Sequence, residues 1–331
     1  MSEKLLQVKN LKTFFKVEAG TVKAVNDVSF GVGEGETVCI VGESGCGKSI
    51  TSMSIMGLIS GNGRIENGEI IYNGQDLLKF SNNEMCKIRG KEIAMIFQEP
   101  MSSLNPVFKI GFQIMEPLLI HEGIGKKEAK AKAVSLLKEV GIPRADEIAE
   151  CYPHELSGGM RQRVMIAMAL ACNPKVLIAD EPTTALDVTI QAQILELMRN
   201  LSKKHNTAIL LITHDLGVVA EMADYVVVMY AGKVIEEGPV LEIFKNTLHE
   251  YTIGLLKSKP SIEEEKDELY AIPGQVPNPI GIKDSCYFSD RCTKCMDICR
   301  KKTPPLRKMG NNHKVACWLF ENDEADKEES K

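Results

Sequence analysis

The sequence predicts an α/β fold with a parallel, helix-covered sheet, followed by a small cysteine-rich module. Short β-branched apolar runs alternate with helical stretches over most of the 331 residues, which is typical of such a sheet. Near residue 258 the composition becomes acidic and then proline-containing, and five of the ten cysteines follow between residues 286 and 317. We therefore expect a large domain at 5–257, a linker at 258–280, a cysteine-rich module at 281–320 and an acidic tail at 321–331.

The first elements are strands and turns over residues 5–45, which end in the apolar run Thr37–Val41. This run is short, largely β-branched and followed by glycine, which predicts a buried strand. We expect a helix from Lys48 to about Ile59 and a strand over residues 64–72.

Residues 82–150 carry a mostly helical pattern, clearest in the amphipathic period of Lys126–Val140. Further strands are expected at Val176–Asp180, Ala208–Thr213 and Tyr225–Met229, separated by helices at Arg161–Ala171 and Thr189–Lys204. This alternation of strands and helices is the reason for expecting parallel pairing.

Composition excludes several classes of protein. Hydrophobic residues make up 44% and charged residues 26% of the chain, which indicates a sizeable core rather than general disorder. The net charge of −5 gives no electrostatic reason to expect nucleic-acid binding. No apolar run approaches the ~20 residues that span a bilayer, and the first residues do not resemble a signal peptide. We therefore expect a cytoplasmic protein, which does not exclude contact with a membrane protein.

A phosphate-binding loop is predicted between the strand at Thr37–Val41 and the helix from Lys48. The sequence G-x-x-x-x-G-K-S is formed by Gly42, Glu43, Ser44, Gly45, Cys46, Gly47, Lys48 and Ser49. Glycines let backbone N–H groups wrap a phosphate, and the helix N-terminus adds the positive end of a dipole. We expect Lys48 to reach the β- and γ-phosphates, Ser49 to bind Mg²⁺, and Ile50 to complete the nucleotide-binding set.

A second element supports this interpretation. The predicted strand Val176–Asp180 ends in two carboxylates, Asp180 and Glu181. Asp180 is suited to hold Mg²⁺ directly or through water, and Glu181 can orient or deprotonate an attacking water.

The segment from Leu156 to Arg163, which reads LSGGMRQR, resembles the signature sequence of ABC transporter ATPases. Other family motifs follow the same order: Gln98 resembles the Q-loop glutamine, Thr184–Asp187 the D-loop, and His214 the switch histidine. The resemblance covers about residues 5–320 and implies a P-loop NTPase core of the ABC ATPase type with a helical subdomain at about 100–170.

Within that family the chain is most similar to the ATPase subunits of dipeptide and oligopeptide importers. The phosphate loop, the segment Phe97–Pro106 and the segment Cys286–Cys292 are typical of that branch, although Thr293 stands where the branch usually has proline. The resemblance implies ATP hydrolysis that energises peptide import. An importer for another solute, such as nickel or a short sugar, is the alternative. A soluble ABC ATPase is less favoured because the chain has one cassette and no long heptad run.

The resemblance also implies roles for single residues. Cassettes of this type pair head to tail, so that Ser157, Gly158 and Gly159 of one close on the γ-phosphate bound by the other. Glu181 would be the general base, His214 would contact the γ-phosphate, and Gln98 would sense Mg²⁺ and the attacking water. Asp187 would bridge the dimer. Phe15, with Phe14 as the alternative, would stack on adenine.

The expected partners are a second ABC ATPase subunit, usually a different chain, two membrane permease subunits and an extracellular peptide-binding protein. The segment from Glu99 to about Gly123 would face the permease. These partners imply a peripheral protein on the cytoplasmic face of the cell membrane.

The clustered cysteines predict a metal site. Cys286, Cys292, Cys299 and Cys317 are separated by gaps of 5, 6 and 17 residues, and Cys295 forms C-x-x-C with Cys292. Thiolates in this number suit Zn²⁺ or a [4Fe–4S] cluster, and spacing alone does not choose between them or exclude unpaired core thiols. The resemblance favours [4Fe–4S] on Cys286, Cys292, Cys299 and Cys317, with Cys295 as a competing ligand. His313 is read as a surface residue, with zinc ligation as the alternative.

Overall fold

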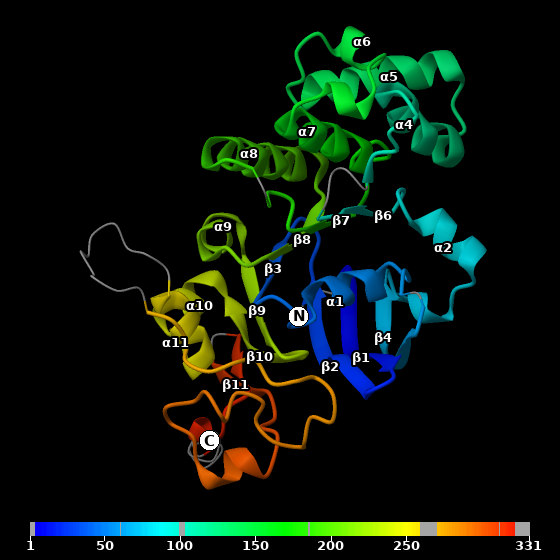
Figure 1. Cartoon of the computed structure of the whole chain (residues 1–331). Coiled ribbons are helices and arrows are strands. Elements are labelled where there is room, and N and C mark those ends of the chain that lie inside the picture. Colours follow the sequence, from blue (N-terminus) through cyan, green and yellow to red (C-terminus); the bar gives the residue numbers. More distant parts are fainter. Residues whose placement is uncertain are drawn as a thin grey trace. The chain divides into compact units, whose positions relative to one another are not determined.

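The computed structural model describes residues 4–59, 61–98, 103–184, 186–258, 270–310 and 312–321. The chain forms two compact units, each assembled from separate parts of the sequence (Figure 1). Unit 1 consists of Met1–Leu6, Val32–Thr37 and Asp76–Ile212. Unit 2 consists of Gln7–Gly31, Val38–Gln75 and Thr213–Lys331.

Unit 1 is built on three parallel strands in the order β6-β7-β8. These are β6 (Ile93–Ile96), β7 (Val176–Asp180) and β8 (Ala208–Thr213). Every residue of β7 and β8 is buried, which explains why both read as continuous apolar runs. The carboxyl end of β7 therefore lies where a parallel sheet presents its functional side chains.

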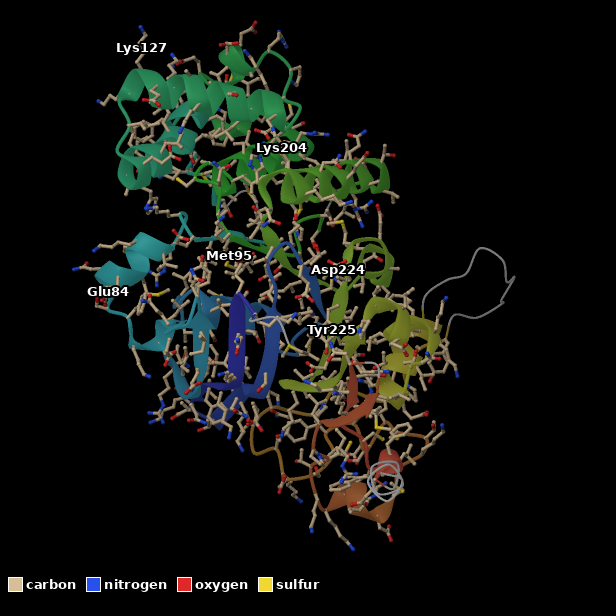
Figure 2. The ribbon with its side chains drawn as sticks, turned by 180° about the vertical axis from the view of Figure 1, so that it is seen from behind. Glu84, Met95, Lys127, Lys204, Asp224 and Tyr225 are labelled. Carbon is tan, nitrogen blue, oxygen red and sulfur yellow. The ribbon has the colours of Figure 1, made fainter. Side chains whose placement is uncertain are left out.

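Unit 1 also contains helices, and Figure 1 shows α4, α5, α6 and α7 gathered into one group. Among the described residues of this unit, the helices include η1 (Leu77–Lys79), α2 (Asn82–Ile88), α4 (Ile110–Pro117), η2 (Leu118–Glu122), α5 (Lys126–Glu139), α6 (Ala145–Ile148), η3 (Pro153–Glu155), α7 (Gly158–Ala169) and α8 (Val188–His205). Ala129, Ala133, Val134 and Leu137 form the buried stripe of α5. Lys127 on the same helix is exposed (Figure 2). Lys204 of α8 donates to Glu139 at 2.6 Å.

Unit 2 contains two groups of strands. The first has the order β2-β1-β4-β5, and the second has the order β11-β12-β10-β9-β3. The bounds are β1 (Leu6–Val17), β2 (Gly20–Val32), β3 (Thr37–Val41), β4 (Gly63–Tyr72), β5 (Gln75–Asp76), β9 (Tyr225–Tyr230), β10 (Lys233–Pro239), β11 (Arg307–Gly310) and β12 (His313–Val315). Strands β3 and β9 are parallel, whereas β10 pairs antiparallel with both β9 and β12. The cysteine-rich segment, predicted at residues 281–320, therefore adds β12 and β11 to the edge formed by β10.

The helices of unit 2 are short. They are α1 (Lys48–Ile55), α9 (Leu216–Met222), α10 (Val240–Lys245), α11 (Glu250–Lys257), η4 (Asp297–Arg300) and η5 (Trp318–Phe320). Tyr225, labelled in Figure 2, begins β9, and its hydroxyl donates to the carbonyl of Asn312 at 3.3 Å. This bond ties the start of β9 to the cysteine-rich segment.

Most predicted elements are confirmed, with three differences. The helix predicted to reach Ile59 ends at Ile55. Residues 82–150, predicted as mostly helical, also contain the buried strand β6, which is too short to show a period. The predicted parallel sheet gains antiparallel strands at β10–β12.

The predicted linker lies partly outside the described residues, and its bounds stay a prediction. No helix of the described residues is both long enough and apolar enough to cross a membrane.

Candidate active site

The predicted phosphate loop connects β3 with α1 in unit 2, and its backbone requires glycine at two points. Gly47 has φ +100°, and a Cβ there would lie 2.3 Å from the carbonyl oxygen of Ala24. A Cβ on Gly42 would lie 2.2 Å from the carbonyl oxygen of Met229. A side chain at either position would displace neighbouring backbone, so only glycine permits this turn.

The loop holds a buried positive charge. Lys48 is 5% exposed, and its Nζ donates to the carbonyls of Gly42 at 2.8 Å and Glu43 at 3.1 Å. Gly47 precedes α1 without any side chain to cap it, so the helix begins as a suitable anion-binding terminus. An ammonium group, a helix N-terminus and a glycine-rich turn together suit a polyphosphate.

Cys46 lies in the same loop but is not a candidate nucleophile. Its Sγ is buried and lies 4.0 Å from Lys48 Nζ. Burial raises the pKa of the Cys46 thiol despite the neighbouring ammonium group, which keeps the thiol protonated at neutral pH.

In unit 1 the structure brings together two of the predicted catalytic residues. Glu181 follows the end of β7, and its Oε2 accepts hydrogen bonds from Gln98 Nε2 at 3.2 Å and Thr184 Oγ1 at 3.0 Å. The backbone of Glu181 has φ +46°, a conformation that non-glycine residues adopt mainly where surrounding structure imposes it. Two donors on one oxygen fix the direction of the carboxylate. Asp180, the last residue of β7, is 4% exposed.

The hydroxyl of Thr184 as a partner of Glu181 was not foreseen. The sequence predicts Thr184 only as part of the D-loop segment Thr184–Asp187. The signal was the spacing of three residues in a turn, since the N–H of Thr184 also donates to the carbonyl of Glu181 at 3.2 Å.

Other predicted residues begin helices. Ser157 caps α7 by accepting from the N–H of Met160 at 3.4 Å, and Ser157 and Gly158 are exposed at that helix start. Asp187 caps α8 by accepting from the N–H of Ile190 at 3.0 Å.

The remaining predicted residues lie in unit 2. His214 is exposed directly after β8. Phe14 and Phe15 are both half-buried, and a Cβ on Gly63 would lie 2.4 Å from the Phe15 ring. The contact does not distinguish which ring stacks on adenine.

The four cysteines predicted as cluster ligands line one small cavity in unit 2, together with His249, Phe288 and Trp318. Burial raises the pKa of the Cys286 thiol to about 12. Cys295 does not line this cavity. Within the described ranges, no three His, Cys, Asp or Glu side chains are grouped closely enough to hold a metal ion.

The prediction that His313 is a surface residue is wrong. His313 is 4% exposed, and its Nε2 lies 2.9 Å from Oε1 of the fully buried Glu236. Glu236 also accepts from the N–H groups of Leu248 and His249 at 2.7 and 3.1 Å. A buried carboxylate needs such partners, and this explains why His313 lies inside. Glu236 is thus the partner of the His313 imidazole, and zinc ligation is not needed to explain the burial of this ring.

Two family models match the chain. One described as "ABC transporter" matches residues 25–184, and one described as "Oligopeptide/dipeptide transporter, C-terminal region" matches residues 235–299. The oligopeptide transport ATP-binding protein AppD of Bacillus subtilis (strain 168) is 56% identical over 323 residues, covering 97% of this chain and 98% of that protein. The oligopeptide transport ATP-binding protein OppD of the same organism is 54% identical, covering 97% of this chain and 90% of that protein.

Solved structures agree with these matches. A dimeric ATP-binding cassette in a post-hydrolysis state, bound to ADP and Pi, has a TM-score of 0.64 and 29% sequence identity, covering 71% of this chain and 98% of that chain.

The fold and the phosphate loop define an ABC ATPase cassette, which confirms the predicted fold class. Such a cassette is an ATPase coupled to transport. With more than half of its residues identical to these relatives over 97% of its length, the chain belongs to the ABC transporter family of oligopeptide transport ATP-binding proteins.

Proposed function

We propose that this chain hydrolyses ATP to energise import of dipeptides or oligopeptides through a membrane ABC transporter. The observation that carries the proposal is identity above 50% to two oligopeptide transport ATP-binding proteins over nearly the whole chain. The match of residues 235–299 to an oligopeptide/dipeptide transporter C-terminal region favours peptides over nickel or a sugar.

The hydrolytic roles follow from the chemistry of the loop and of the β7 carboxylates. Lys48 and the N–H groups of the loop bind the β- and γ-phosphates, with the nucleotide-binding set Gly42–Ile50 around them. Ser49 and Asp180 offer the hard oxygen donors that Mg²⁺ prefers. Bound Mg²⁺ would neutralise charge on the phosphates.

Glu181 then accepts a proton from the water that attacks the γ-phosphorus. The bond from that phosphorus to the bridging oxygen of ADP breaks, releasing ADP and inorganic phosphate. Gln98 and Thr184 hold the carboxylate through the two bonds to its Oε2, and His214 contacts the γ-phosphate. Ser157, Gly158 and Gly159 of a paired cassette close on the γ-phosphate, and Asp187 bridges that pair.

An apolar surface on unit 1 supports docking of a permease. Val107, Phe108, Phe112 and Ile120 are 70%, 45%, 46% and 69% exposed, an unusual concentration of exposed apolar side chains. Phe112 also lines a cavity of about 170 Å³, whose polar lining includes Lys109, Lys130 and Glu150. We place the permease contact here. The partners would be two permease subunits, an extracellular peptide-binding protein and a second, non-identical ATPase subunit, with this chain peripheral on the cytoplasmic face of the membrane.

The test is uptake by proteoliposomes that contain the permease subunits, the binding protein, this chain and the second ATPase subunit. Labelled di- and oligopeptides should accumulate only with ATP, and a Glu181→Gln chain should bind ATP but support no uptake. Uptake of nickel or a sugar in place of peptides would overturn the substrate assignment while keeping the transporter class. Peptide uptake with this chain as the sole ATPase would overturn the heterodimer.

We also propose that Cys286, Cys292, Cys299 and Cys317 hold a [4Fe–4S] cluster. The four line one cavity, so the donor set fits a cluster bound by four thiolates. The resemblance of the segment Cys286–Cys292 to peptide-importer ATPases favours the cluster over zinc. The cavity that these cysteines help to line has a volume of about 10 Å³, so its lining side chains would reorient around a bound cluster.

Metal analysis of anaerobically purified full-length protein tests this assignment. About four irons and four sulfides per chain are expected, with loss of both in a Cys299→Ser variant and retention in Cys295→Ser. One zinc and no iron would overturn the cluster. Loss of iron in Cys295→Ser would overturn the ligand set.

A further inference from the structure

One side chain of the cysteine-rich segment is bonded directly to the phosphate loop. Arg291, which precedes Cys292, places Nη1 at 2.8 Å and Nη2 at 3.1 Å from the two carboxylate oxygens of Glu43. Glu43 is the second residue of the loop, 248 positions earlier in the chain. The arrangement is a two-pronged guanidinium–carboxylate pair, the geometry in which arginine gives both strength and direction.

The guanidinium of Arg291 is fixed on every side. Its side chain is 5% exposed. Beyond Glu43, Nε donates to the carbonyl of Pro273 at 2.9 Å, Nη2 to that of Ile272 at 3.2 Å, and Nη1 to Tyr230 Oη at 3.3 Å. Arginine has five N–H donors, and these five bonds use all of them. A side chain held in this way cannot swing away from Glu43 without losing bonds elsewhere.

A second contact holds the same loop residue. The N–H of Glu43 donates to Tyr251 Oη at 2.8 Å. Tyr251 is fully buried and contacts the rings of Tyr230 and Phe288 at centroid distances of 4.7 and 5.5 Å. Phe288, like Arg291, belongs to the segment Cys286–Cys292. The segment Cys286–Cys292 therefore holds the side chain of Glu43 directly through Arg291. It also packs, through Phe288, against the tyrosine that accepts from the backbone N–H of Glu43.

The support matters because of where Glu43 lies. Its carbonyl accepts the hydrogen bond from Lys48 Nζ, the group expected to reach the phosphates. Glu43 is thus held by Arg291, Tyr251 and Lys48 at once. A loop fixed before the ligand arrives loses less conformational freedom on binding.

We propose that Arg291 is a positioning residue for nucleotide binding, which holds the phosphate loop through Glu43 in the conformation that receives the phosphates. This inference rests on the proposed ATPase function. The cysteine-rich segment then contributes to ATP affinity without touching ATP. A purely structural tie would stabilise the protein but leave the affinity of the folded chain unchanged, and this difference is measurable.

The experiment compares full-length variants by ATP dissociation constant, KM, kcat and thermal midpoint. Arg291→Lys keeps the charge but loses the two-pronged geometry. Glu43→Gln changes the same pair from the loop side, where the carboxylate is 29% exposed, so we expect this variant to fold. The matched control is Arg300→Gln, because Arg300 pairs with Asp290 at 3.3 Å on the exposed surface of the same segment.

We expect Arg291→Lys and Glu43→Gln each to raise Kd and KM for ATP by about tenfold, with kcat at saturating ATP within threefold of the unsubstituted chain. The double variant should bind ATP no more weakly than whichever single variant has the higher Kd, because both substitutions remove the same Arg291–Glu43 interaction. Arg300→Gln should bind ATP normally.

Unchanged ATP affinity in folded variants with a lower thermal midpoint would overturn the positioning role. Additive losses in the double variant would also overturn it. If Arg291→Lys does not fold, Glu43→Gln alone decides. Failure of the unsubstituted chain to bind ATP would overturn the proposed function together with this inference, whereas normal binding by both variants overturns the inference alone.

Discussion

Replacing Glu181 with glutamine tests the proposed general base most directly. The substitution keeps the shape of the side chain and an oxygen that can accept from Gln98 and Thr184, so the local structure should persist. It removes the group that takes the proton from water. General-base catalysis contributes about 10²–10⁴ in rate, which corresponds to about 2.7–5.5 kcal/mol of transition-state stabilisation.

The expected result is a separation of binding from turnover. ATP affinity should stay within threefold of the unsubstituted chain, while kcat for phosphate release should fall by at least a hundredfold. The kcat of Thr184→Val should lie between those of the unsubstituted chain and Glu181→Gln. This variant removes one hydrogen bond to the carboxylate, worth about 0.5–1.5 kcal/mol, and should lower kcat by about two- to tenfold.

The assay is steady-state phosphate release with ATP dissociation constants measured on the same preparations. Glu196→Gln serves as the control, because it makes the same chemical change at an exposed carboxylate of α8. Hydrolysis by Glu181→Gln within threefold of the unsubstituted chain would refute the role of Glu181 as base. A tenfold loss of ATP affinity would refute the separation of binding from turnover.

Three further predictions concern the loop and the permease surface. Lys48→Ala should weaken ATP binding by about 10- to 100-fold in a direct binding assay, since it removes a charge-assisted contact, and normal affinity would contradict that role. Gly47→Ala should lower the free energy of unfolding by at least about 2 kcal/mol in urea titrations, because a Cβ would lie 2.3 Å from the carbonyl oxygen of Ala24 at φ +100°, and an unchanged midpoint would count against this strain. Phe112→Ser should reduce peptide uptake while ATP affinity stays normal; unaltered uptake would remove this surface as the permease contact.

Locally encoded features were predictable from the sequence. The loop Gly42–Ser49 is recognisable because its glycines and lysine must be adjacent to work. The strands β7 and β8 read as continuous apolar runs because they are buried on both faces. The strand β6 was missed because four residues are too few to show a period against its helical neighbours.

Pairings between distant residues were decided by the tertiary structure. The pair of Glu43 with Arg291 spans 248 positions, and the buried pair of Glu236 with His313 spans 77. No spacing rule encodes such pairs, because they depend on which segments the sheet brings side by side. Here β12 pairs with β10 and carries His313 inward next to Glu236. The same reason applies to the cysteines, because spacing does not reveal which thiols share a cavity: Cys286, Cys292, Cys299 and Cys317 line one, whereas the competing ligand Cys295 does not line it.

Local spacing along the chain was therefore enough to identify the phosphate loop and the carboxylates after β7, and the resemblance to ABC transporter ATPases supplied the class of the protein and the remaining catalytic candidates. The tertiary structure alone decided how those residues are supported, from the two donors on Glu181 to the guanidinium that holds Glu43. The physical reason is that a motif specifies which groups can act, whereas directed hydrogen bonds between distant segments specify where those groups are held.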